Sequence, residues 1–146
     1  MIEHLTKETF KEKIFDYSKE KEFKYVGKLP VVVDFYADWC GPCKMVSPIL
    51  EDLAVEYRDI IDIYKINTEH EETLSKMFGI RSIPSILFIP LDGEPKMAQG
   101  AMSKVQFEKL FKDIFEIEKP ALPKGEDEVE QKLKEEETPA DDVKKE

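Results

Sequence analysis

Two cysteines, Cys40 and Cys43, are the residues of this chain whose type and spacing predict chemistry most directly. They lie in the run WCGPC, residues 39–43, so their sulfurs can meet across the first turn of a helix with little backbone movement. Pro42 favours a helix start here, because a proline in the first turn gives up only an N–H that has no partner. The free N–H groups and the dipole at that end favour a thiolate on Cys40. We therefore expect Cys40 to attack a disulfide and Cys43, one turn further in and more buried, to resolve the mixed disulfide.

The same spacing also occurs in half of a zinc site and in a static disulfide. A zinc site needs further ligands, and His4 and His70 are the two histidines available, far apart in sequence and without a paired spacing. A static disulfide across so short a loop would constrain the unfolded chain very little. Both alternatives therefore explain the pair less well than reversible redox chemistry, and we predict no metal site.

Length and charge limit the remaining classes of function. The chain has 146 residues, enough for one ordinary domain, and its 32 acidic and 22 basic side chains give a formal net charge of −10. This balance argues against nucleic acid or an anionic membrane surface as the main partner. No apolar run approaches the roughly 18 residues of a membrane span. The opening MIEHLTKETF lacks a basic start followed by an apolar block, so we expect no secretory signal in the sequence as given.

The charge is distributed unevenly and divides the chain in two. Residues 119–146 hold 10 acidic and 6 basic side chains and no aromatic residue. Such a segment buries too little apolar surface to offset the entropy of ordering it. We therefore predict one domain over residues 1–118, with a long charged N-terminal segment at 1–30, and an acidic, disordered tail at 119–146.

The apolar pattern of the first 118 residues alternates between helix and strand. Val31–Tyr36 (VVVDFY) is typical of a central parallel strand, and Thr6 and Ser103 are typical helix N-caps. The predicted helices cover about 7–17, 42–57, 71–78 and 104–117, and the predicted strands cover 31–36, 61–66, 85–89 and 96–99, with a short edge strand at 23–26. This order implies a mixed sheet with helices on both faces.

Asp34 is the one polar residue in the predicted central strand. Burial disfavours the charged form of a carboxyl group and raises its pKa. A carboxylate with a raised pKa near Cys43 can accept the proton of that thiol as the thiol attacks. The alternative is an aspartate on an edge strand that forms a salt bridge with a surface lysine.

These segments together resemble the thioredoxin family. The likeness covers roughly residues 29–115 and rests on WCGPC preceded by VDFYAD, on KMVSPILEDLA, on Lys65 in YKIN, on RSIPS, on the Asp-Gly turn and on QGA before the last helix. The resemblance implies a thioredoxin fold, which is a three-layer α/β/α structure with a central mixed β-sheet flanked by helices. It also implies dithiol–disulfide exchange.

The resemblance further implies roles for individual residues. Asp34 matches the buried proton acceptor of the family, and Lys65 matches the lysine that modulates it, although a purely structural Lys65 explains the sequence equally well. Pro84 matches a cis-proline that exposes the backbone of Ile83 to an incoming peptide. The substrate-binding rim would comprise Trp39, Gly41, Pro42, Ile83, Pro84, Gly100 and Ala101.

We therefore expect a monomeric protein-disulfide reductase that works through the Cys40–Cys43 pair without a permanently bound cofactor. The resemblance implies thioredoxin reductase as the electron donor, protein disulfides as substrates and the cytoplasm as the location. One alternative is a periplasmic thioredoxin-like reductase or isomerase whose signal peptide has been removed. Another is a non-catalytic subunit that holds a partner with the same surface, although such a subunit does not require an intact WCGPC.

Overall fold

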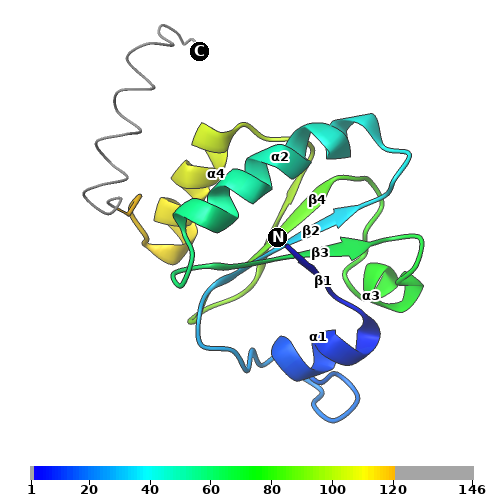
Figure 1. The fold of residues 1–146 in the computed structure, drawn as a ribbon. Helices are drawn as coiled ribbons and strands as arrows, with labels where there is room; N and C mark the ends of the chain where they lie inside the picture. Colours follow the sequence, from blue (N-terminus) through cyan, green and yellow to red (C-terminus); the bar gives the residue numbers. More distant parts are fainter. Residues whose placement is uncertain (1, 121–146) are drawn as a thin grey trace, which may run out of the picture.

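The computed structural model describes residues 2–120 of the chain, and its core is a five-stranded sheet in the order β1-β3-β2-β4-β5. Strands β1, β3 and β2 are parallel, β4 is antiparallel to β2, and β5 is antiparallel to β4. Figure 1 shows α2 and α4 together on one side of this sheet and α1 on the other. The elements are β1 (Glu3–His4), α1 (Lys7–Lys13), β2 (Val31–Tyr36), α2 (Gly41–Glu56), β3 (Asp62–Asn67), α3 (Glu72–Met77), β4 (Ser85–Ile89), β5 (Lys96–Gln99), α4 (Lys104–Leu110) and a π-helical turn at Phe111–Phe115 that continues α4.

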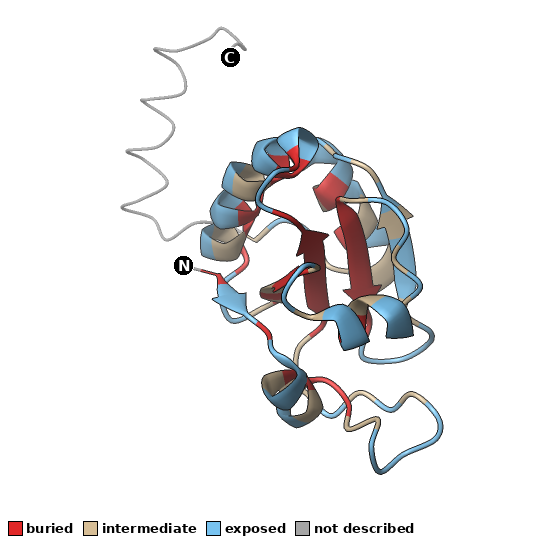
Figure 2. Ribbon diagram, turned by 90° about the vertical axis from the view of Figure 1, so that its right-hand side faces the viewer, coloured by how far each residue is buried: buried red, intermediate tan, exposed pale blue. Residues whose placement is uncertain are grey.

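Strand β2 is the centre of the sheet, and all six of its residues are buried. Because side chains alternate along a strand, its two faces enter different cores. Val31, Val33 and Phe35 pack in the core that α1 and α3 cover, whereas Val32 packs in the core that α2 and α4 cover. Figure 2 shows the buried central strands between the more exposed outer helices. The predicted three-layer architecture and mixed sheet are confirmed.

Helix α2 presents one apolar stripe to the sheet. Val46, Leu50 and Leu53 of this helix are fully buried against β2 and β4, as their spacing predicts. The exposed side of the helix carries Pro48. This stripe fixes the rotation of α2 about its axis and therefore the direction in which its first turn faces.

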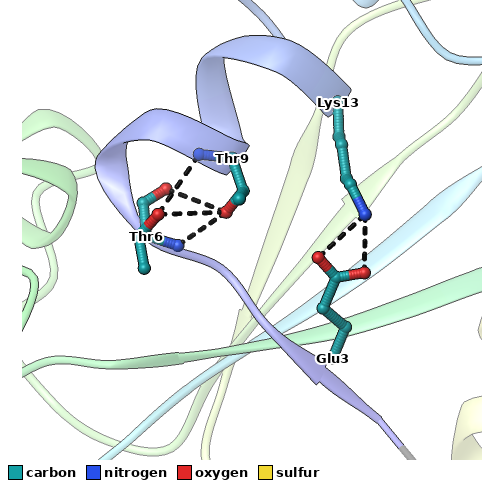
Figure 3. Close-up of polar contacts among 4 residues, drawn as sticks. All are labelled: Glu3, Thr6, Thr9 and Lys13. Atoms are coloured by element: carbon teal, nitrogen blue, oxygen red, sulfur yellow. Dashed lines mark hydrogen bonds and ion pairs between the residues drawn. The ribbon is translucent and has the colours of Figure 1, made fainter.

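Helix α1 is held at its start by the predicted cap and at its end by an ion pair (Figure 3). Thr6 Oγ1 accepts a hydrogen bond from the backbone N–H of Thr9, and Thr9 Oγ1 accepts one from the backbone N–H of Thr6. Lys13 Nζ lies 2.6 Å from a carboxylate oxygen of Glu3, which ties α1 to β1. At α4, the predicted N-cap Ser103 forms a capping box with Gln106.

Two predicted elements in the N-terminal segment differ in the structure. Helix α1 ends at Lys13 rather than Tyr17, because the chain turns there and packs Phe15 against Phe23, with ring centroids 5.1 Å apart. The predicted strand at 23–26 does not form. Instead, the backbone N–H of Val26 bonds to the carbonyl of Ile14. The predicted tail lies outside the described residues from 121 onwards.

Candidate active site

The two cysteines form a disulfide at the N-terminus of α2, with their Cα atoms 5.3 Å apart. Cys40 is the N-cap residue, and its Sγ accepts a hydrogen bond from the backbone N–H of Cys43 at 3.2 Å. The prediction that Cys43 is the more buried of the two is wrong, since both are 4% exposed. Both cysteines belong to one cluster of buried residues with Tyr36 and Ala37.

The segment before β4 lies against this disulfide. The Ile83–Pro84 peptide bond is cis, the isomer that the resemblance implied. The carbonyl oxygen of Ile83 lies 3.9 Å from Cys40 Sγ. Gly100, whose φ of +93° favours glycine, donates its backbone N–H to the carbonyl of Pro84 at 2.8 Å. Residues from three parts of the chain therefore meet beside the sulfur of Cys40.

The surroundings of the disulfide include one large exposed aromatic side chain. Trp39 is 68% exposed, and its indole N–H donates a hydrogen bond to the Glu69 carboxylate at 2.7 Å. Gly41, Pro42 and Ala101 are also exposed. Glu69 was not identified from the sequence. It could have been, because parallel strands β2 and β3 end at the same edge of the sheet and the residues that follow them meet there.

Asp34 is fully buried, and neither of its carboxylate oxygens has a hydrogen-bond partner among the described residues. It is two residues from Val32 on β2 and so faces the same layer, the one covered by α2. Cys43 is buried one turn before Val46 of that helix, which places its side chain in this layer. Burial raises the pKa of Asp34 from 3.8 to about 7, and the charge of Lys65 acts in the opposite direction. The alternative of an edge-strand aspartate in a salt bridge is wrong, since β2 is central.

Lys65 lies on β3 directly beside Asp34 in the parallel register. Its Nζ donates a hydrogen bond to Ser47 Oγ of α2 at 3.1 Å.

Within residues 2–120, no group of three or more histidine, cysteine or acidic side chains could hold a metal ion. No helix in that range is long and apolar enough to cross a membrane.

Comparison with known proteins identifies this arrangement. The sequence model of the family described as Thioredoxin matches residues 1–113. The chain belongs to the thioredoxin family. A thioredoxin of Borreliella burgdorferi is 49% identical over 111 residues, which cover 76% of this chain and 95% of that protein. The chloroplastic M-type thioredoxin of Spinacia oleracea is 41% identical over 87 residues, 60% of this chain and 48% of that protein.

A solved structure, that of chloroplastic thioredoxin z, superimposes with a TM-score of 0.65 at 27% identity. The superposition covers 77% of this chain and 93% of the thioredoxin z chain. The thioredoxin fold is therefore confirmed. Thioredoxins act on disulfide substrates, receive electrons from a reductase and carry no permanent cofactor, because their redox group is a disulfide of the chain itself. This thioredoxin is a protein-disulfide oxidoreductase with a Cys40–Cys43 pair.

Replacing Asp34 with asparagine should stabilise the fold, and more so at alkaline pH. The folded protein raises the pKa of Asp34 from 3.8 to about 7. Between these values the folded chain binds a proton that the unfolded chain releases, so wild-type stability falls as pH rises. The gain in the free energy of unfolding from Asp34→Asn should be about 2–3 kcal/mol larger at pH 8 than at pH 5. Urea unfolding of the oxidised protein at both pH values measures this difference.

Asp38→Asn is the matched control, because Asp38 is an exposed aspartate just after the same strand. The difference between the two pH values should be larger for Asp34→Asn than for Asp38→Asn, because Asp34 is fully buried and Asp38 is exposed. If Asp34→Asn had equal effects at pH 5 and pH 8, the Asp34 carboxyl would titrate alike in the folded and unfolded chains, contrary to its burial.

Proposed function

We propose that Cys40 is the attacking thiolate and Cys43 the resolving thiol in the reduction of protein disulfides. The Cys40 thiolate attacks one sulfur of the target disulfide, a bond forms between them, and the other target sulfur leaves as a thiolate. Cys43 then attacks Cys40 Sγ, which restores the Cys40–Cys43 disulfide and releases the second target thiolate. Two electrons pass to the target, and its two thiolates take up the two protons that the cysteines gave up.

Asp34 is the proton acceptor for Cys43 in this proposal. The observation that carries it is a fully buried carboxyl group that has no hydrogen-bond partner among residues 2–120 and faces the layer that holds Cys43. A group whose pKa lies at about 7 exchanges a proton near neutral pH with little cost in either direction. In the reverse reaction, Asp34 returns the proton to Cys43.

In this proposal, the substrate is a protein whose chain is extended on either side of the target disulfide. Trp39, Gly41, Pro42 and Ala101, none of which carries a charge, provide exposed surface beside the disulfide. The cis Ile83–Pro84 bond presents the backbone of Ile83 next to the sulfur, where an extended peptide can pair with it as a short added strand. Gly100 completes this side of the site by fixing the carbonyl of Pro84.

We further propose that the protein is a monomer that reduces disulfides in the cytoplasm. It would receive its electrons from thioredoxin reductase. Gly-Pro between the cysteines and isoleucine before the cis-proline are typical of reducing members of the family, and they support this choice over the periplasmic alternative. The net charge of −10 supports acting on proteins rather than on nucleic acid or anionic membranes.

Serine variants of the two cysteines should fail in different ways. Cys40→Ser should abolish reduction of a protein disulfide, because no thiolate remains at the helix N-terminus to attack. Cys43→Ser should allow the attack but not the release, so mixed disulfides accumulate. Intact-protein mass spectrometry after mixing with a disulfide substrate measures the adduct, which should disappear on addition of dithiothreitol. Normal turnover by Cys40→Ser would contradict the assigned order of attack.

The oxidised protein should be reduced by NADPH through thioredoxin reductase. Oxidation of NADPH, followed at its absorbance maximum with a protein disulfide as final acceptor, measures the cycle, and Cys40→Ser provides the control without turnover. Failure to recycle, together with an oxidising reduction potential, would contradict the cytoplasmic reductase and support the periplasmic role.

A further inference from the structure

The ammonium group of Lys65 forms no ion pair with Asp34, the residue beside it in the register of β2 and β3. Asp34 and Lys65 lie side by side on β2 and β3, yet no ion pair joins them within hydrogen-bonding distance, and both Asp34 oxygens lack partners among residues 2–120. Lys65 Nζ instead donates to Ser47 Oγ at 3.1 Å and lies 4.5 Å from the centre of the Tyr36 ring. Its charge is therefore satisfied by a hydroxyl group and an aromatic face.

The two groups that hold the ammonium are themselves fixed. Tyr36 is the last residue of β2, it is 9% exposed, and its hydroxyl group bonds to His4 Nδ1 at 3.0 Å. Ser47 lies on α2 one turn after Cys43, so the core stripe of that helix sets its position. A cavity of about 190 Å³ lies between them, lined by Tyr36, Ala37, Asp38, Cys43, Lys44, Ser47 and Lys65.

We propose that Tyr36 and Ser47 are positioning residues that hold the Lys65 ammonium outside ion-pair contact with Asp34. This inference rests on the proposed role of Asp34 as the proton acceptor of Cys43. It assigns functions to an aromatic ring and a hydroxyl group that take no part in the bond changes or the proton transfer themselves.

The physical consequence concerns the pH at which Asp34 can accept a proton. An opposite charge in direct contact lowers the pKa of a carboxyl group by about 1–3 units. A Lys65–Asp34 ion pair would thus keep Asp34 ionised and make it a weak base for a thiol. With the ammonium held aside, burial outweighs the charge of Lys65 and the pKa of Asp34 stays at about 7.

Besides Lys65, two charged residues line this cavity. Lys65 comes from β3, while Lys44 of α2 and Asp38 of the loop after β2 line the cavity and are exposed. The residue beside Asp34 on β4 is Ile86, which carries no charge. The charge that acts on the titration of Asp34 is that of Lys65. In the proposal, the contacts of Lys65 with Ser47 and Tyr36 control where this charge lies.

The test is a titration of the Asp34 carboxyl carbon by ¹³C NMR in the oxidised protein, where neither cysteine titrates. Ser47→Ala removes the hydrogen-bond acceptor and should lower the pKa of Asp34 by about 1 unit, as Lys65 turns toward the carboxylate. Lys65→Met removes the cation and should raise the pKa of Asp34. In the Lys65→Met background, Ser47→Ala should have no further effect, because no ammonium remains to be released.

The ring of Tyr36 is tested separately. Tyr36→Leu should lower the pKa of Asp34 in the same direction as Ser47→Ala, whereas Tyr36→Phe keeps the aromatic face and should retain the wild-type titration. A Ser47→Ala variant with an unchanged or raised Asp34 pKa would overturn the proposal, as would a shift that persists without Lys65. Trapping of mixed disulfides by Cys43→Ser is independent of this titration, so failure of the positioning role and failure of the proposed exchange mechanism are distinguishable.

Discussion

Burial of one carboxyl group without a partner is the constraint on which the rest of this structure depends. Asp34 lies on the central strand, with β3 and β4 on either side and α2 above, and no hydrogen-bond donor among the described residues reaches its oxygens. Burial of this kind disfavours the charged form and lowers stability above the ordinary pKa of a carboxyl group. In the proposed mechanism, this raised pKa lets Asp34 accept a proton near neutral pH.

The two halves of the site are positioned by different parts of the fold. Alternation along β2 directs Asp34 into the layer of α2, and the apolar stripe of α2 directs its first turn, with Cys40 and Cys43, toward the same layer. The substrate side depends on loops, namely the cis bond before β4 and the turn at Gly100 after β5, which meet beside Cys40. The groups proposed for the proton transfer thus lie on a strand and a helix, while loops form the proposed substrate side.

The sequence predicted the elements that carry strong periodicity or specific turn chemistry. Strands β4 and β5 and the caps at Thr6 and Ser103 have the predicted residues, because alternation, a tight turn and a capping box are local signals. The two-residue strand β1 was too short to show any period, and the end of α1 depends on packing between Phe15 and Phe23. The same limit applies to the site. The burial of Asp34 could be predicted from the apolar strand that contains it. The contacts among Tyr36, Ser47 and Lys65 could not, because they join three different elements and produce no periodic pattern in the sequence.

The unimolecular step in which Cys43 attacks Cys40 tests the central role of Asp34 most directly. When the reduced protein reacts with excess 5,5′-dithiobis(2-nitrobenzoate), attack by Cys40 releases the first thiolate and attack by Cys43 releases the second, which stopped-flow absorbance resolves as a phase independent of reagent concentration. With Asp34 as the proton acceptor, the rate of this second phase should rise with an inflection near neutral pH, and Asp34→Asn should remove that inflection. Identical pH profiles for the wild type and Asp34→Asn would contradict the account.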